Sequence, residues 1–150
     1  MIIRISHKAI IIKDGKILLN TNKDVKGIFY MLPGGGQEHG ETIHKSLERE
    51  CLEETGLIIK VGELVFVRDY IENNHEFADI GTDAHQVELM FLCEAINDDN
   101  FGKVTLFDNW QTGVEWIEIH KLIKCRIYPS ILKTLIPSIG KKNRLYIWVM

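Results

Sequence analysis

The stretch GGQEHGETIHKSLERECLEETGL, residues 35–57, is the most informative part of the chain. Each residue of an α-helix turns about 100° around the axis. Ile43, Leu47 and Cys51 therefore lie in one apolar row at i, i+4 spacing. Such a row faces the core in a globular protein. The stretch predicts an amphipathic helix with one buried side.

The sequence also marks both ends of this helix. Thr42 is placed to cap the first turn with its hydroxyl group, and the helix is predicted to run to about Thr55. Gly56 follows, where left-handed backbone geometry usually ends a helix. Before the helix, residues 32–36 read Leu-Pro-Gly-Gly-Gly. This run predicts a loop whose backbone is able to approach a metal ion or a phosphate closely.

Three carboxylates share one side of the last two helical turns. Seven residues after Leu47 the apolar row reaches Glu54, with Glu50 beside the row and Glu53 on the other side of Glu50. Like charges repel at this distance, and burying them unpaired is costly. A hard cation such as Mg²⁺, which prefers oxygen ligands, offsets that cost. Arg49, four residues before Glu53, is placed to hold a carboxylate.

A simpler interpretation competes with the metal site. A run of Glu and Arg on a helix is most often a solvated face, with Glu54 frayed at the helix end. The preceding glycines favour the metal interpretation, because a plain strand-to-helix turn needs one glycine and not three in succession.

The rest of the chain alternates strand-like and polar segments. Asp14-Gly15 predicts a type I′ hairpin, and the apolar run Val87–Ile96 predicts a central strand. No repeat or linker is present, so a single domain over 1–150 is expected. The predicted strands are 3–13, 16–20, 57–61, 64–70, 87–96 and 114–119; a helix is predicted at 128–136, polar loops at 72–86 and 97–113, and a last strand or docked tail at 145–149.

Composition excludes several classes of function. The 150 residues carry a net charge of -3, with 26% charged and 45% hydrophobic residues, which is not typical of a nucleic-acid-coating surface. Cys51, Cys93 and Cys125 have neither disulfide nor CxxC spacing and predict a reduced, cytoplasmic protein. Charge soon interrupts the apolar N-terminus, which argues against a signal peptide, and no apolar run is long enough to span a bilayer.

The fixed positions of residues 35–57 resemble a known signature. Gly35, five residues, Glu41, seven residues and then Arg-Glu-Cys-x-Glu-Glu-x-Gly-Leu at 49–57 resemble the Nudix box of Nudix (MutT-like) hydrolases. Cys51 stands where an aliphatic residue is usual, but a buried free cysteine behaves as a small hydrophobe. The resemblance implies an α/β fold, the family's α/β/α sandwich with a central mixed β-sheet.

The resemblance also implies a metal centre. Glu50, Glu53 and Glu54 would bind Mg²⁺ or Mn²⁺, with the carbonyl group of Gly34 as a further ligand. The implied reaction is hydrolysis of the pyrophosphate bond in a nucleoside diphosphate linked to another group. The cation would neutralise phosphate oxygens and lower the pKa of the attacking water.

Three residues would act in catalysis. Arg49 and Glu41 would orient the carboxylates through salt bridges. Glu53 would position or deprotonate the attacking water, although family members differ in which residue is the base.

The substrate is not specified by the box. Ile71 and Glu72 occupy the region where ADP-ribose hydrolases carry a proline, and Asn73 and Asn74 follow where diadenosine polyphosphate hydrolases carry a tyrosine. The NADH-type Ser-Gln-Pro-Trp run is also missing. A nucleoside triphosphate or a nucleotide sugar remains open, and no substrate-binding residue is assigned.

Two other functions fit a Nudix-like fold. A nucleotide-sensing module binds without cleaving, and the loss of box carboxylates would favour it, but all are present. Prenyl-diphosphate isomerase chemistry expects further catalytic cysteine and glutamate positions, which the sequence does not place.

Residues outside the box are weaker candidates. Glu88 interrupts an apolar strand, where a charge is costly unless it is paired or near the site. Asp98, Asp99 and Asp108 lie in a loop within possible reach, but turn formation explains them more simply. The apolar run 145–150 predicts either docking on the chain's own sheet or a homodimer. The other expected partner is a small nucleotide; neither a membrane nor a nucleic acid is expected.

Overall fold

The computed structural model describes residues 2–72, 83–105, 110–140 and 148–149. Its helices are α1 (Ile43–Thr55), the 3-10 helix η3 (Ile119–Lys124) and α2 (Leu132–Ser138). Within these residues no helix is long and apolar enough to cross a membrane. The strands are β1 (Ile3–Lys13), β2 (Lys16–Asp24), β3 (Gly27–Met31), β4 (Gly34–Gly36), β5 (Ile58–Ile71), β6 (His85–Asn97), β7 (Gln111–Glu118), β8 (Ile127–Tyr128) and β9 (Trp148–Val149).

The strands in the described part of the chain form one mixed sheet. Its order is β8-β3-β2-β1-β6-β5-β9, with β4 beside β1 and β7 beside β2. Strand β6 runs parallel to β1 and antiparallel to β5, so it is central, as its long apolar run predicts. Asp14 and Gly15 join β1 to β2 with φ angles of 51° and 73°, the left-handed geometry expected of the hairpin.

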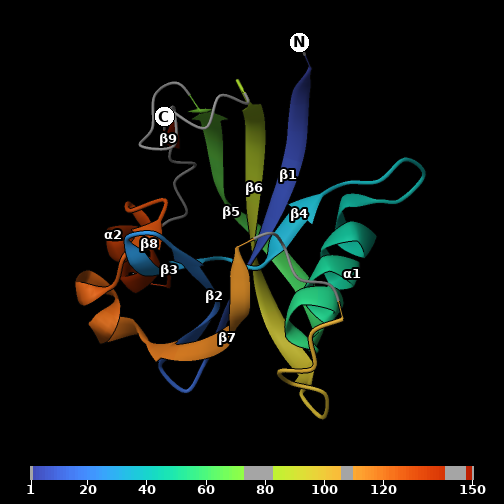
Figure 1. Ribbon diagram of the computed structural model, residues 1–150. Helices are drawn as coiled ribbons and strands as arrows, with labels where there is room; N and C mark the ends of the chain where they lie inside the picture. The colour runs from blue at the N-terminus through green and yellow to red at the C-terminus, as the bar shows by residue number, and fades with distance from the viewer. Residues whose placement is uncertain (1, 73–82, 106–109, 141–147, 150) are drawn as a thin grey trace.

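Helices α1 and α2 cover opposite sides of this sheet (Figure 1). Side chains alternate between the two sides along β1. Ala9 and Ile11 pack in one core with Leu47 of α1, whereas Ile10 packs in a second core with Leu135 of α2. The two cores on either side of a mixed sheet agree with the α/β/α arrangement expected from the sequence.

Two segments near the box differ from the predictions. Residues 34–36, predicted as part of a loop, form β4, because they pair with Ser6–Lys8 of β1. The predicted gap between residues 61 and 64 does not end a strand. Strand β5 continues through it with register shifts against β6, which are typical of bulges.

The C-terminal predictions were correct only in part. The helix predicted for 128–136 begins at Leu132, because Ile127 and Tyr128 pair with β3 instead. Neither β3 nor η3 was predicted. Trp148 and Val149 pair with β5, which supports docking of the tail for these two residues. Residues 73–82, 106–109, 141–147 and 150 lie outside the described residues.

Candidate active site on helix α1

Helix α1 begins and ends where the sequence predicts. The Thr42 hydroxyl oxygen accepts a hydrogen bond from the Lys45 backbone N–H at 3.2 Å. Gly56, at φ 76°, donates its N–H to the carbonyl oxygen of Leu52 at 3.0 Å. Both caps satisfy backbone groups that a helix end leaves unpaired. They fix the length of the helix and the angles at which its side chains leave it.

Glu54 continues the buried row of α1. Leu47 and Cys51 are fully buried, and Glu54 exposes only 2% of its surface. Its Oε2 accepts hydrogen bonds from Asn20 Nδ2 at 2.6 Å and from the Gly34 backbone N–H at 3.2 Å. The prediction that a carboxylate breaks this apolar row is confirmed. Hydrogen bonds to an ionised group offset part of the cost of burying it.

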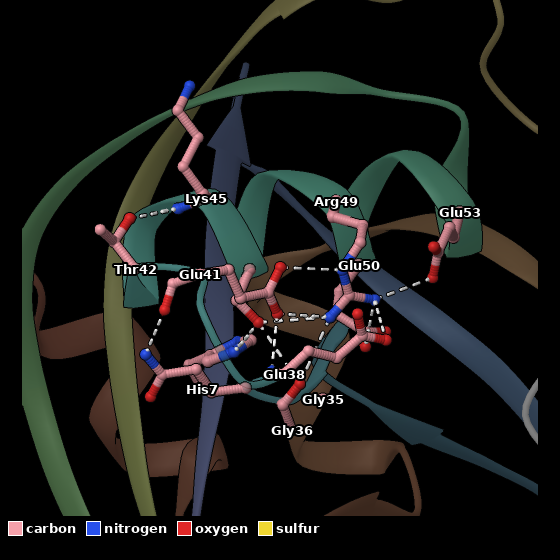
Figure 2. A network of polar contacts seen from close by, with 12 residues as sticks. His7, Gly35, Gly36, Glu38, Glu41, Thr42, Lys45, Arg49, Glu50 and Glu53 are labelled. Atoms are coloured by element: carbon pink, nitrogen blue, oxygen red, sulfur yellow. Dashed lines mark hydrogen bonds and ion pairs between the residues drawn. The ribbon is translucent and has the colours of Figure 1, made fainter.

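Arg49 is the centre of a second network on the same helix (Figure 2). Its Nη2 and Nε donate to the two carboxylate oxygens of Glu41 at 2.8 and 3.1 Å. Its Nη1 lies 3.0 Å from Glu50 Oε1 and 3.3 Å from Glu53 Oε2. One guanidinium group therefore holds three carboxylates.

The charges of this network stabilise one another. Hydrogen bonding to Glu41, and then to Glu50, raises the pKa of Arg49. Hydrogen bonding to Arg49, followed by the backbone N–H of Glu38, lowers the pKa of Glu41 to about 2. Glu41 therefore stays ionised throughout the neutral range.

Strand β4 brings the backbone against these side chains. A Cβ atom on Gly35 would lie 2.7 Å from the carboxylate carbon of Glu50, and one on Gly34 would overlap the carbonyl group of His7. Only glycine fits at position 34, whereas a Cβ at position 35 would push the Glu50 carboxylate aside. The carbonyl oxygen of Gly36 accepts from Arg49 Nη2 at 3.4 Å. Gly34 and Gly35 thus allow a strand to pass directly beside the carboxylates.

The last turn of α1 is held by the segment between β6 and β7. Its carbonyl groups, which a helix leaves unpaired, accept hydrogen bonds from this segment and from Gln111, the first residue of β7. The pairs are Gly102 N–H to Thr55 at 2.9 Å, Thr105 N–H to Glu53 at 2.9 Å, and Gln111 Nε2 to Glu54 at 3.0 Å.

His7 connects β1 to the first half of α1. It is fully buried, and its Nε2 lies 2.6 Å from the Ser46 hydroxyl oxygen. Ser46 in turn donates to the Gly36 carbonyl at 3.3 Å and lies 3.4 Å from Arg49 Nη2. Burial, followed by the nearby charge of Lys8, lowers the pKa of His7 to about 4. The contact therefore joins a neutral imidazole to a hydroxyl group.

The donor set on α1 suits a hard divalent cation. Glu50, Glu53 and Glu54 supply carboxylate oxygens beside a glycine backbone, which is the ligand chemistry of Mg²⁺ and Mn²⁺. As they stand, Glu50 and Glu53 face Arg49. No three acidic, histidine or cysteine side chains among the described residues are arranged to hold an ion. Glu50 and Glu53 have 16% and 27% of their side chains exposed, so both carboxylates are accessible to an ion from solution.

Of the candidate residues named outside the box, those that the structure describes do not join the carboxylates of α1. Glu88 is paired with Arg68, with Oε2 2.7 Å from Nη1. By strand alternation it lies on the same face as Met90, which packs in the core that includes α2, so it points away from α1. Asp98 is exposed and pairs with Lys13 at 3.5 Å.

Two further aspartates were named from the sequence. Asp99 accepts a hydrogen bond from Asn97 Nδ2 at 3.4 Å and serves a local turn. Asp108 lies outside the described residues.

The sequence analysis did not identify the buried polar residues of the sheet that form hydrogen bonds with α1. Asn20, His7 and Gln111 come from three different strands, and each is more than nine-tenths buried. The available signal was a polar side chain at the inward position of an apolar strand. Asn20, which directly follows Ile17–Leu19, is the clearest case.

The comparisons with known proteins agree on one family. The family model described as NUDIX domain matches residues 4–137. An ADP-ribose pyrophosphatase of Methanocaldococcus jannaschii is 39% identical over 92 residues, 60% of this chain. The match spans only 50% of that curated relative.

Solved structures share the fold at lower identity. A NUDIX hydrolase from Nitrosomonas europaea has a TM-score of 0.74 and 18% identity, covering 97% of this chain and 94% of that one. A UDP-X diphosphatase has a TM-score of 0.71 and 21% identity, with 98% and 68% covered. A MutT NUDIX hydrolase from Burkholderia pseudomallei has a TM-score of 0.62 and 24% identity, with 79% and 85% covered.

The TM-scores of these three structures, from 0.62 to 0.74, show that they share the fold of this chain. Because the family model matches most of its length, the chain belongs to the NUDIX domain family.

Proposed function

We propose that this chain is a Nudix pyrophosphohydrolase. It hydrolyses the pyrophosphate bond of a nucleoside diphosphate linked to another group, with Mg²⁺ or Mn²⁺ as the cofactor. The observation that carries the proposal is the gathering of Glu50 and Glu53 around Arg49, with Glu54 buried beside them. A stability role alone gives no reason to concentrate carboxylates against a glycine strand.

The ligands in this proposal are Glu50, Glu53, Glu54 and the carbonyl group of Gly34. When bound, the cation supplies neutralisation of phosphate oxygens and activation of a water molecule. Of the three ligand carboxylates, Glu53 has the most exposed side chain, at 27%, so it is best placed to take the water's proton. The water oxygen then bonds to one phosphorus, the bridging P–O bond breaks, and its electron pair leaves with the other phosphate.

Arg49 and Glu41 position the ligands. Glu41 fixes the guanidinium group through two hydrogen bonds. That group offsets part of the negative charge of Glu50 and Glu53 while they await a cation. Because these contacts are 3.0 and 3.3 Å long and partly exposed, the two carboxylates are able to exchange Arg49 for the cation.

The substrate class is proposed more broadly than the reaction. A nucleoside triphosphate or a nucleotide sugar fits the box equally well. The names of two relatives, an ADP-ribose pyrophosphatase and a UDP-X diphosphatase, put ADP-ribose and UDP-sugars first among the compounds to test. ADP-ribose is also the substrate whose expected downstream proline this chain lacks. A reduced, cytoplasmic protein remains part of the proposal.

Two substitutions test the site assignment. Glu53→Gln and Glu54→Gln keep side-chain size but remove a charge, and each should lower kcat on the best substrate by about 10²–10⁴-fold. Glu48→Gln is the matched control, because Glu48 lies on the same helix but pairs with Lys45 at the surface. It should keep wild-type turnover. Wild-type turnover in both test variants would refute the assignment.

A further inference from the structure

Several buried polar side chains outside the box share one pattern. Asn20, Gln111 and His7 each bond α1 with one end, while the other end lacks a hydrogen-bond partner among the described residues. Buried polar atoms without partners are uncommon in folded proteins and need an explanation. Here the hydrogen bond to α1 explains why each polar side chain is buried. Of the three, Asn20 is the residue that bonds a carboxylate of the candidate site.

The orientation of Asn20 follows from chemistry. An ionised carboxylate only accepts hydrogen bonds, so the amide must turn its NH₂ group towards Glu54. The contact is short, at 2.6 Å between Nδ2 and Oε2, and both residues are buried. The unpartnered Oδ1 is the consequence of that orientation. A leucine of similar size would remove this unpartnered atom but could not hold the carboxylate.

We propose that Asn20, on strand β2, is a positioning residue of the metal centre: its amide fixes the Glu54 carboxylate in the orientation that binds the cation. This inference rests on the proposed function, because it assigns Glu54 to the cation. Carboxylate ligands are themselves held by hydrogen bonds, and losing such an outer partner typically weakens metal binding by about 10–100-fold. The Gly34 N–H bonds the same oxygen but belongs to the backbone, whereas Asn20 is a partner that substitution can remove.

Gln111 provides the matched control for Asn20. Both are buried amides from sheet strands, and both bond Glu54. Gln111, however, contacts the backbone carbonyl group and not the carboxylate. Gln111→Leu therefore loosens the end of the helix without touching the metal ligand. A purely structural role for Asn20 predicts equal effects of Asn20→Leu and Gln111→Leu on metal affinity.

The test measures Mn²⁺ affinity by calorimetric titration without substrate, together with the Mn²⁺-induced rise in Tm. Asn20→Leu should bind Mn²⁺ about 10–100-fold more weakly than wild type, and Gln111→Leu should bind it clearly better than Asn20→Leu. The double variant Asn20→Leu/Glu54→Gln should bind no more weakly than Glu54→Gln alone, because Asn20 acts through Glu54. Asn20→Ser carries the same comparison if Asn20→Leu does not fold.

Three outcomes would overturn the inference. They are wild-type affinity in the Asn20 variants, an equal loss in Gln111→Leu, or fully multiplicative losses in the double variant. If wild type hydrolyses nucleotides with Mn²⁺ while the Asn20 variants keep its affinity, only this inference fails. If wild type binds no divalent cation, the proposed function fails and the inference falls with it.

Discussion

Arg49 is the residue on which the carboxylates of the site depend. Its single guanidinium group contacts Glu41, Glu50 and Glu53 at 2.8 to 3.3 Å. A planar fork with five N–H donors is able to serve several carboxylates at once, which a lysine ammonium on a flexible stem does less well. The positive charge also limits repulsion among the carboxylates.

Arg49→Lys should therefore be far from conservative. The charge remains, but the paired hydrogen bonds to Glu41 are lost. We expect kcat/KM at saturating Mg²⁺ to fall by about 10–100-fold, as is typical when a hydrogen-bonding partner of metal ligands is changed. Lys45→Arg, in the exposed pair with Glu48, is the control and should retain activity. Full activity of Arg49→Lys would show that the fork geometry is unimportant.

His7 makes stability depend on pH. Burial, the largest cause, lowers its pKa from 6.5 to about 4 in the folded state. Between these values the unfolded chain binds more protons, so stability falls as pH falls from 6.5 towards 4, by up to about 3 kcal/mol. In His7→Gln this part of the slope should vanish. Urea denaturation from pH 4 to 7 measures the free energy of unfolding of both proteins. An equal pH dependence in wild type and His7→Gln would contradict this role of His7.

At the scale of elements, local sequence rules predicted some features and missed others for identifiable reasons. Helix α1 was predicted with both ends because its caps and its apolar row lie within the segment. Strand β4 was missed because its pairing partner, β1, lies more than 20 residues away. Strand β8 was missed for the same reason, because its pairing partner β3 is also distant in the sequence.

The residues of the candidate site also fall into those that local sequence predicted and those that it did not. The box carboxylates and Arg49 follow a spacing that is visible in the sequence. Asn20 and His7 contact α1 only after β1 and β2 have folded against it, at separations of 34 and 39 residues. No local pattern specifies such a partner.

Gly56 determines how α1 ends. Its φ of 76° is strained for other residues, and a Cβ there would overlap the Asn100 carbonyl oxygen. Gly102 has a similar φ of 82° but open space around it. Gly56→Ala should therefore destabilise the protein by more than the roughly 1–2 kcal/mol that left-handed geometry costs alone, while Gly102→Ala should show only that cost. Equal free energies of unfolding for the two variants would argue against a steric role of Asn100.

At the scale of the whole molecule, the sheet separates two cores, and α1 carries the candidate chemistry on one side. The N-terminal end of β1 leaves apolar side chains in solvent, with Ile3 60% and Ile5 47% exposed. The sequence left a homodimer open as the alternative to a docked tail, and the dimer remains a prediction for the protein in solution.

Sedimentation equilibrium tests the dimer directly. Wild type should sediment as twice the chain mass at micromolar concentration. Ile3→Glu/Ile5→Glu should shift the equilibrium towards monomer, because burying two charged side chains in a dimer interface is costly. A wild-type protein that is monomeric throughout the concentration range would rule the dimer out.

The central claim is that α1 directs cation-dependent cleavage of a pyrophosphate bond. The most direct measurement is phosphate or nucleotide release from a panel of nucleoside triphosphates, UDP-sugars and ADP-ribose, each with Mg²⁺, with Mn²⁺ and with chelator. At least one compound should be cleaved at its P–O–P bridge, only with a cation, and far more slowly by Glu53→Gln. Tight binding of one nucleotide with no cleavage of any compound would contradict the claim and indicate a nucleotide-sensing module instead.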